Sequence, residues 1–201
     1  AQTQVRFGRL DVLVNNAGRS IRRSVVECKT EDLERLMAVN YLGPMTLTLG
    51  LLPAMLERCG GHVVQVSTIG VQTGAPNFAA YVASKAAADH FVRSLRLELG
   101  GRGIDVTTVH VPLVRTPMMA PTRICEAFPA QGVEKAAQRI GWAVVKRPIR
   151  VAPRWATLLE VTHAIAPGLL QWVFTHGHEP FHALMSRRLA RRNRRGADSA
   201  R

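Results

Sequence analysis

Short apolar runs alternate with longer amphipathic stretches along this chain. Three valine-rich runs, at residues 11–14, 62–67 and 105–111, have the length and composition of buried strands. The segments between them are long enough for helices, and this order is typical of parallel βαβ crossovers. The pattern therefore predicts an α/β fold in which helices cover both faces of a parallel sheet.

The first long helix is predicted to begin near Thr30, whose hydroxyl can cap it, and Gly60 and Gly61 are expected to end it. Its apolar positions recur every three or four residues, at Leu33, Leu36, Met37, Tyr41, Met45 and Leu49. Pro53 lies inside this pattern and is expected to bend or split the helix, because proline removes an internal hydrogen bond.

A second long helix is predicted over residues 79–99, before the turn sequence GGRG. Beyond Val111, prolines become frequent and a helical pattern is clear only around residues 133–146. We expect loops and helices over the carboxyl edge of the sheet there, rather than further strands.

The chain has 201 residues and a formal net charge of +13, and much of this charge lies at its end. Residues 187–201 contain seven arginines against Asp198, a local charge of +6. A solvated, partly disordered tail is expected, and contact with an anionic membrane surface is the alternative. Aromatic residues are not interleaved with these arginines, so no nucleic-acid partner is expected.

The cysteines are few and far apart, which indicates neither a disulfide framework nor a zinc knuckle. They are Cys28, Cys59 and Cys125. A reducing, cytoplasmic location is therefore expected, or one peripheral to the membrane if the tail binds lipid. The opening sequence AQTQVRFGRL has neither an initiating Met nor a signal-peptide core, so we expect the chain to begin within a domain.

An uncharged stretch, residues 161–178, is a poor candidate for a membrane-spanning helix because it contains Pro167 and three histidines. A spacing that could bind a metal occurs at His176, His178 and His182. Glu179 is the single carboxylate beside them, and they lie far from the strand ends. We therefore expect solvated or half-buried histidines and no metal site.

Small and polar residues follow each apolar run, where open parallel sheets bind their ligands. They are Asn15, Asn16, Ala17 and Gly18 after the first run, Ser67 and Thr68 at the end of the second, and Thr116 in a proline loop after the third. Small side chains let the backbone approach a ligand, and hydroxyls donate hydrogen bonds. The sequence predicts a binding site at this edge.

Tyr81 and Lys85 are four residues apart in the second predicted helix, so they share a face. A nearby ammonium favours the phenolate and would lower the pKa of the tyrosine from its usual value near ~10. Such a tyrosine can give a proton to a carbonyl oxygen as a hydride reaches the carbon. The hydroxyl of Thr68 or Ser67 can hold that oxygen.

With these motifs, the chain resembles the short-chain dehydrogenase/reductase family over residues 8–119. The resemblance implies a Rossmann-like, doubly wound parallel sheet and an oxidoreductase that uses NADP or NAD. YVASK matches the family's Tyr-x-x-x-Lys motif and implies catalytic roles for Tyr81 and Lys85. Thr68 takes the place of the family's hydroxyl donor, with Ser67 beside it, and both remain candidates.

Cofactor contacts are also implied by the resemblance. NNAG, at Asn15, Asn16, Ala17 and Gly18, matches the stretch that lies along the cofactor, and further contacts are implied for Asn40, Tyr81, Lys85, Pro112, Val114 and Thr116. Asn40, in AVNYLG, takes the place of a catalytic asparagine that holds a water to the lysine. The loop after the third run departs from the family's Pro-Gly-x-Val-x-Thr, because Val111 and Pro112 stand at its first two positions.

The family's Gly-rich turn, TGxxxGxG, does not occur in this sequence. The resemblance therefore implies a sheet that lacks the first βαβ units, and half of a cofactor site. Residues 1–118 would be the carboxyl-terminal part of the Rossmann domain, and residues 119–186 its substrate lid and final helical region. Residues 187–201 would be the basic tail.

The runs IGVQT, AYVASKAA and PLVRTPM resemble most closely the reductase domain of bacterial fatty acyl-CoA reductases. This implies a lipid-like carbonyl substrate, a long-chain fatty aldehyde or acyl-CoA reduced with NADPH, and a homo-oligomer. An apolar lid or interfacial helix for such a substrate could include Leu169, Leu170, Trp172, Val173, Phe174, Phe181, Leu184 and Met185, although core packing or a subunit contact explains them at least as well. The alternatives are a 3-oxoacyl or hydroxysteroid reductase, and an inactive module that acts only in association.

Overall fold

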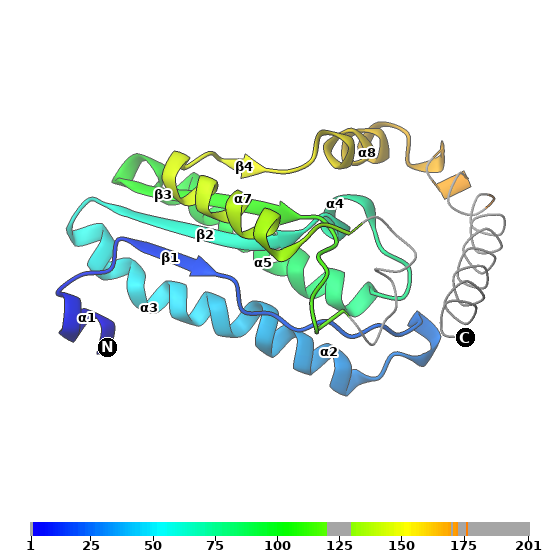
Figure 1. The fold of residues 1–201 in the computed structure, drawn as a ribbon, viewed down its shortest axis with the longest axis horizontal. Helices are drawn as coiled ribbons and strands as arrows, with labels where there is room; N and C mark the ends of the chain where they lie inside the picture. The colour runs from blue at the N-terminus through cyan, green and yellow to red at the C-terminus, as the bar shows by residue number, and fades with distance from the viewer. Residues whose placement is uncertain (1, 120–129, 170, 173–175, 177–201) are drawn as a thin grey trace, which may run out of the picture.

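Four parallel strands form the centre of the molecule (Figure 1). The computed structural model describes residues 2–119, 130–169, 171–172 and 176. The strands are β1 (Val12–Asn15), β2 (Gly61–Thr68), β3 (Ile104–Val111) and β4 (Arg150–Val151), hydrogen-bonded in that order. The predicted parallel α/β fold is confirmed, with the sequential strand order of one half of a doubly wound sheet.

The register of the sheet decides where its loops meet. β2 and β3 pair along their whole lengths, so Thr68 and Val111 end side by side. β1 ends earlier, because Asn15 pairs with Gln65. The NNAG loop therefore leaves the sheet beside the last residues of β2.

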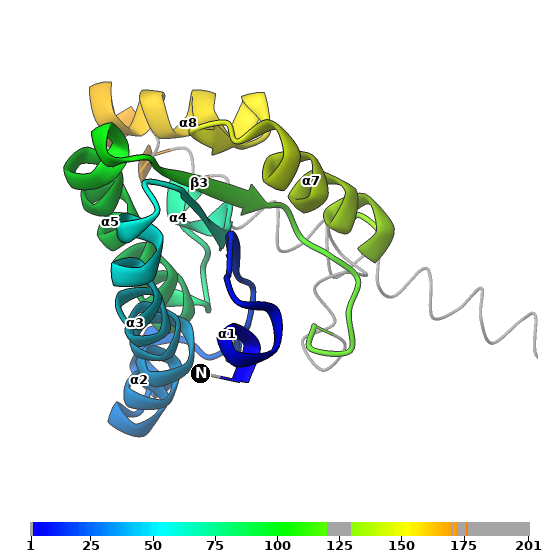
Figure 2. The ribbon, with the colours of Figure 1, turned by 90° about the vertical axis from the view of Figure 1, so that its left-hand side faces the viewer.

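Helices lie on both faces of the sheet (Figure 2). One face carries α2 (Thr30–Met37), a π-helical segment (Ala38–Leu42), α3 (Gly43–Glu57) and α5 (Ala79–Leu99), and the other carries α7 (Val133–Lys146). α8 (Arg154–Ile165) lies beyond β4, and the shorter elements are α1 (Gln2–Phe7), α4 (Gly70–Thr73), and 3-10 turns at Val25–Glu27 and Gly100–Arg102. The predicted helices at residues 79–99 and 133–146 are confirmed.

Two apolar cores hold these layers together. Between the sheet and α3 and α5 lie Leu13, Met45, Leu52, Met55, Val63, Ala88, Val92, Leu95, Ile104 and Val106. Beneath α7 lie Val64, Val66, Val109, Val111, Ala136 and Ala143. The stretch Thr30–Glu57 is long and apolar enough to cross a membrane by length and composition alone, and in this fold it packs on the sheet.

The structure corrects two expectations from the sequence. Of the bend or split expected at Pro53, the split does not occur, because α3 runs through this residue to Glu57. The irregular part of this helical stretch is instead the π-helical segment, where Asn40 lies. The region after Val111 does add sheet, since β4 pairs with β3, and it forms α8 as well as α7. A two-residue strand is too short to give a periodic pattern in the sequence.

Gly103 is the residue of the β3 turn that tolerates no side chain. Its φ is +79°, and a Cβ atom would lie 2.1 Å from the carbonyl oxygen of Cys59. We expect Gly103→Ala to lower the free energy of unfolding by about 3 kcal/mol, through strain and backbone overlap. Urea unfolding beside Gly101→Ala, where a Cβ meets open space, measures this, and equal losses in both variants would refute it.

Candidate active site

The predicted site residues converge where β1 and β2 end and α5 begins. β2 supplies Thr68, α5 supplies Tyr81 and Lys85, and the π-helical segment supplies Asn40. π-helical segments inside longer helices occur frequently at functional sites, because they change which way a side chain points.

Asn40 fixes the loop that follows NNAG. Its side chain is fully buried, and its Oδ1 accepts a hydrogen bond from the backbone N–H of Arg19 at 2.8 Å. Its Nδ2 donates to the carbonyl oxygen of Arg19 at 2.8 Å and to Oγ of Ser84 at 2.9 Å. The Ser84 hydroxyl in turn donates to the carbonyl oxygen of Tyr81 at 2.7 Å. Asn40 thereby ties the loop after β1 to the first turns of α5.

Lys85 lies against the same loop. Its Nζ donates to the carbonyl oxygen of Val66 at 3.0 Å, and its side chain is buried. A Cβ atom on Gly18 would lie 3.2 Å from both this Nζ and Oδ1 of Asn40. The glycine of NNAG is therefore the residue that leaves room for the lysine. Burial lowers the pKa of Lys85, and the carboxylate of Asp89 partly opposes this shift.

The side chain of Thr68 lies close enough to the Tyr81 hydroxyl to lower its pKa. Burial raises the pKa of Tyr81, and the nearby Thr68 side chain works in the opposite direction. The expectation that Lys85 lowers the pKa of this tyrosine is not met, because burial is the largest influence and the ammonium donates to Val66 instead. At neutral pH the phenol keeps its proton and is available as an acid.

Thr68 and Ser67 occupy different environments. The backbone N–H of Gly70 donates to Oγ1 of Thr68 at 3.3 Å, which orients the hydroxyl that meets Tyr81. Ser67, one residue earlier on the strand, points to the opposite face. Its Oγ is buried and has no hydrogen-bond partner among the described residues. The geometry thus favours Thr68 as the donor beside the tyrosine.

The other predicted cofactor residues lie around this centre. Asn15 is buried and its Nδ2 donates to Oγ1 of Thr48 at 3.0 Å, so it braces β1 against α3. Asn16 and Ala17 are exposed at the strand end. Pro112 comes directly after β3, next to Val111, which pairs with Thr68. In the loop that follows, Val114 forms a β-bridge with Gln131 and Thr116 is half-buried.

Three polar residues of the site were not found from the sequence. Ser84 lies inside the YVASK motif, one turn after Tyr81, and this spacing could have identified it. Asp89 and His110 form a buried pair between α5 and β3, with Oδ2 and Nε2 2.7 Å apart. Asp89 lies one turn beyond Lys85, but its pairing with β3 depends on the register of a distant strand.

Several predictions concern residues outside the described ranges, and these stay predictions. Cys125, His178, His182, the apolar residues Phe181, Leu184 and Met185, and the tail at residues 187–201 are not described. Cys28 and Cys59 are free thiols. Within the described ranges, no group of three His, Cys, Asp or Glu side chains is arranged to hold a metal ion.

Comparison with known proteins agrees with this geometry. Residues 1–126 match the family model described as short chain dehydrogenase. Fatty acyl-CoA reductase of Acinetobacter baylyi is 46% identical over 174 residues, which are 86% of this chain and 59% of that protein. Fatty acyl-CoA reductase of Mycobacterium tuberculosis is 43% identical over 186 residues, 91% of this chain and 60% of that protein. The chain therefore spans about three fifths of these curated relatives.

Solved structures show the same fold. A short-chain dehydrogenase from Streptomyces avermitilis superposes with a TM-score of 0.70 at 30% identity, covering 89% of this chain and 74% of that one. One from Burkholderia cenocepacia, in complex with NADP, gives a TM-score of 0.72 at 25% identity, covering 84% and 70%. From the matched family model, the conserved architecture and the Tyr81–Lys85 centre together, this chain belongs to the short-chain dehydrogenase family.

Proposed function

We propose that this chain carries the catalytic half of an NAD(P)-dependent carbonyl reductase. The observation that supports this most strongly is the placement of Tyr81 beside Thr68 at the carboxyl end of β2, with Lys85 one helical turn away. When the substrate carbonyl lies between the two hydroxyls, Thr68 donates a hydrogen bond to its oxygen. Tyr81 then donates its proton to that oxygen as the carbon is reduced.

The residues present fit the nicotinamide half of a bound cofactor, NADP or NAD. Gly18 has no side chain between the strand end and Lys85, and Asn16 and Ala17 leave the backbone accessible beside it. The buried ammonium of Lys85 is placed to bind a ribose hydroxyl and to stabilise negative charge at the tyrosine. When bound, the cofactor would supply the hydride. The residues that hold a pyrophosphate in this family are not in this sequence.

A long-chain fatty aldehyde or fatty acyl-CoA is the proposed substrate. The two relatives named as fatty acyl-CoA reductases support this choice. The alternatives are a 3-oxoacyl or hydroxysteroid reductase, and a module that acts only by association. Residues 120–129 of the loop after β3, where the substrate lid is expected, lie outside the described ranges.

We also propose a homo-oligomer, with a cytoplasmic location that includes the membrane surface if the basic tail binds lipid. Support for self-association comes from exposed leucines on the outer side of the helices over one face, at Leu42, Leu47, Leu49 and Leu97. Apolar side chains exposed on neighbouring helices are typical of subunit contacts. Light scattering of the purified chain measures the mass, and a monomer at all concentrations would refute this part.

The chemistry is tested on a completed chain, in which residues 1–201 follow the preceding segment of the Acinetobacter relative. Reduction of a long-chain aldehyde, an acyl-CoA, a 3-oxoacyl thioester and a ring ketone is compared with NADPH and with NADH. We expect the fatty aldehyde or acyl-CoA to have the highest kcat/KM. Preference for the ring ketone or the 3-oxoacyl thioester would favour the first alternative, and no turnover despite cofactor binding would favour the second.

The roles of the two hydroxyls are separated by one pair of substitutions. We expect Thr68→Ala to lower kcat of the completed chain by about 10²-fold, because it removes the donor beside Tyr81. Ser67→Ala is the matched control and should leave kcat within about 3-fold, since its hydroxyl lies on the other face. A larger loss in the Ser67 variant would reverse the assignment.

A further inference from the structure

The outer face of α8 carries an apolar stripe without a partner among the described residues. Its members are three or four positions apart, at Trp155, Leu158, Val161 and Ile165. Leu158 is 66% exposed and Ile165 is 80% exposed. We call these four residues the α8 stripe. A row of this kind on one side of a helix normally packs against something apolar.

The opposite side of α8 packs on the domain. Ala156 is fully buried, and Oε2 of Glu160 accepts a hydrogen bond from Nε2 of Gln72 on α4 at 3.0 Å. This contact fixes which side of the helix faces out. In Figures 1 and 2, α8 lies beyond β4, at the end of the sheet opposite β1. A strand added next to β1 would therefore not cover the α8 stripe.

The surface around the α8 stripe is cationic. Between residues 146 and 172 there are four cations, Lys146, Arg147, Arg150 and Arg154, against the single carboxylate Glu160. Glu160 is paired with Arg150, and Arg147 is paired with Asp105 on β3. Lys146 and Arg154 have no carboxylate partner in the described part of the chain. Two copies of this face would bring like charges together, which disfavours a second copy as its partner.

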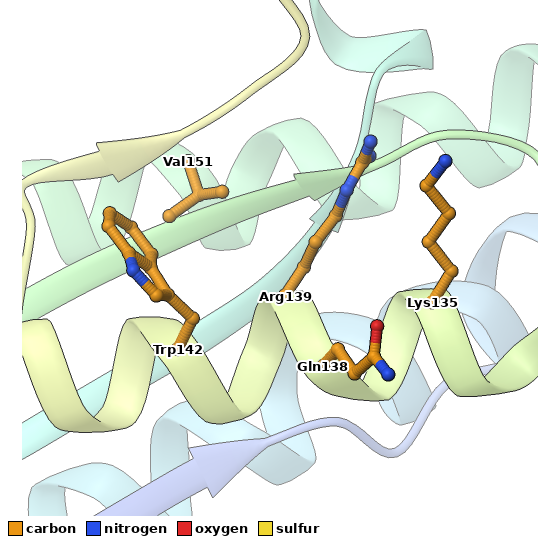
Figure 3. A pocket seen from close by; sticks show the side chains of 5 residues that line it. All are labelled: Lys135, Gln138, Arg139, Trp142 and Val151. Atoms are coloured by element: carbon orange, nitrogen blue, oxygen red, sulfur yellow. The ribbon is translucent and has the colours of Figure 1, made fainter.

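A hollow of about 230 Å³ adjoins β4, and two of the side chains that line it are cationic (Figure 3). It is lined by Lys135, Gln138, Arg139, Trp142 and Val151. In Figure 3 the side chains of Lys135 and Arg139 extend from α7 on the same side as Trp142, which is half exposed. Cations beside an exposed tryptophan suit the boundary between lipid headgroups and acyl chains, where tryptophan is enriched.

We propose that the α8 stripe docks this protein on an anionic lipid surface, with α8 lying in the plane of the interface. The apolar side chains enter the boundary between headgroups and acyl chains, and Arg154, Lys146 and the α7 cations contact the anionic headgroups. This site is distinct from the arginine-rich tail, which has no apolar residues for insertion after Leu189 except alanine. It is also independent of the chemistry at Tyr81.

Tryptophan fluorescence of the whole 201-residue chain tests the proposal. In the variant Trp142→Phe/Trp172→Phe, Trp155 is the remaining tryptophan and reports on the α8 stripe. On vesicles that contain phosphatidylglycerol in phosphatidylcholine, we expect a blue shift and quenching by brominated acyl chains. Vesicles of phosphatidylcholine alone should give much weaker binding, because the headgroup contacts are electrostatic.

Variants separate insertion from electrostatic adsorption by the tail. We expect Leu158→Asn/Ile165→Asn to weaken partitioning by at least about 10-fold, since apolar area drives insertion. Val25→Asn/Val26→Asn, at two exposed valines in the 3-10 turn Val25–Glu27, is the matched control and should bind like the unmodified chain. Circular dichroism checks that both variants fold, as expected for exposed positions.

Binding to vesicles without quenching of Trp155 would show that the tail adsorbs alone, and would overturn the proposal. Equal binding by the α8-stripe variant and the Val25→Asn/Val26→Asn variant would overturn it too. If light scattering showed dimers that the Leu158→Asn/Ile165→Asn variant abolishes, the occupant would be a second copy. None of these measurements depends on catalytic turnover. The lipid-docking proposal can therefore be tested even if the proposed function fails.

Discussion

Tyr81→Phe is expected to lower kcat for carbonyl reduction by about 10³-fold in the completed chain, within the range usual for a general acid. The phenylalanine ring keeps the edge contact with Phe78, so the fold should persist. What is lost is the hydroxyl that meets Thr68 and gives its proton to the substrate oxygen. Absorbance of NADPH follows the rate, and cofactor binding is measured on the same variant.

The role of Tyr81 as an acid also predicts how the rate of the unmodified completed chain depends on pH. Because burial raises the pKa of Tyr81, the phenol is the form present across the neutral range. The rate of reduction should therefore be flat there and fall only at alkaline pH, while the reverse oxidation should rise with pH. A Tyr81→Phe variant with nearly full activity, or a reduction rate that falls between mildly acidic and neutral pH, would contradict the assigned role.

Lys85→Met is expected to have the second-largest effect, a loss of kcat by about 10²- to 10³-fold. The substitution keeps a long side chain in the space beside Gly18 but removes the buried ammonium. Charge that develops at Tyr81 would then have no cation near it, and a ribose hydroxyl would lose its partner. Parallel measurements of kcat and cofactor affinity on the completed chain separate these two losses.

The same variant should not lower stability at neutral pH. The pKa of Lys85 is lowered in the folded chain, so its protonation opposes folding increasingly as pH falls below the value it has in the unfolded chain. Methionine removes that cost, although the hydrogen bond to Val66 is lost with it. Urea unfolding at pH 7 of the 201-residue chain should give a free energy at least equal to that of the unmodified chain. A marked loss of both stability and activity would show that Lys85 is structural.

Much of the site could be predicted because its residues are close together in sequence. Tyr81 and Lys85 share one helix, and strand ends are where small and polar residues follow an apolar run. Gly18 lies beside Lys85 because the carboxyl ends of parallel strands lie at one edge of the sheet. Asn40 reaches the same site from the π-helical segment. The long helices at residues 79–99 and 133–146 were predictable for a related reason, since their apolar periodicity is strong over many turns.

Other features depend on contacts that no local pattern contains. The choice between Ser67 and Thr68 turns on which face the last residue of β2 presents, and a shift of one position reverses it. The effect of Lys85 on Tyr81 was misjudged because burial and the carbonyl oxygen of Val66 are tertiary features. The π-helical segment carries Asn40, whose hydrogen bonds to Arg19 and Ser84 join parts of the chain that are distant in sequence.

The most direct test of the central claim follows the hydride itself. The completed chain is incubated with a long-chain aldehyde and with NADPH carrying deuterium at the transferable position, and the alcohol is analysed by mass spectrometry. We expect one deuterium at the alcohol carbon, and loss of this product when Tyr81 is replaced by Phe. A completed chain that binds NADPH but transfers no deuterium to any of the four carbonyl substrates would contradict the assignment of this chain as the catalytic half of a reductase.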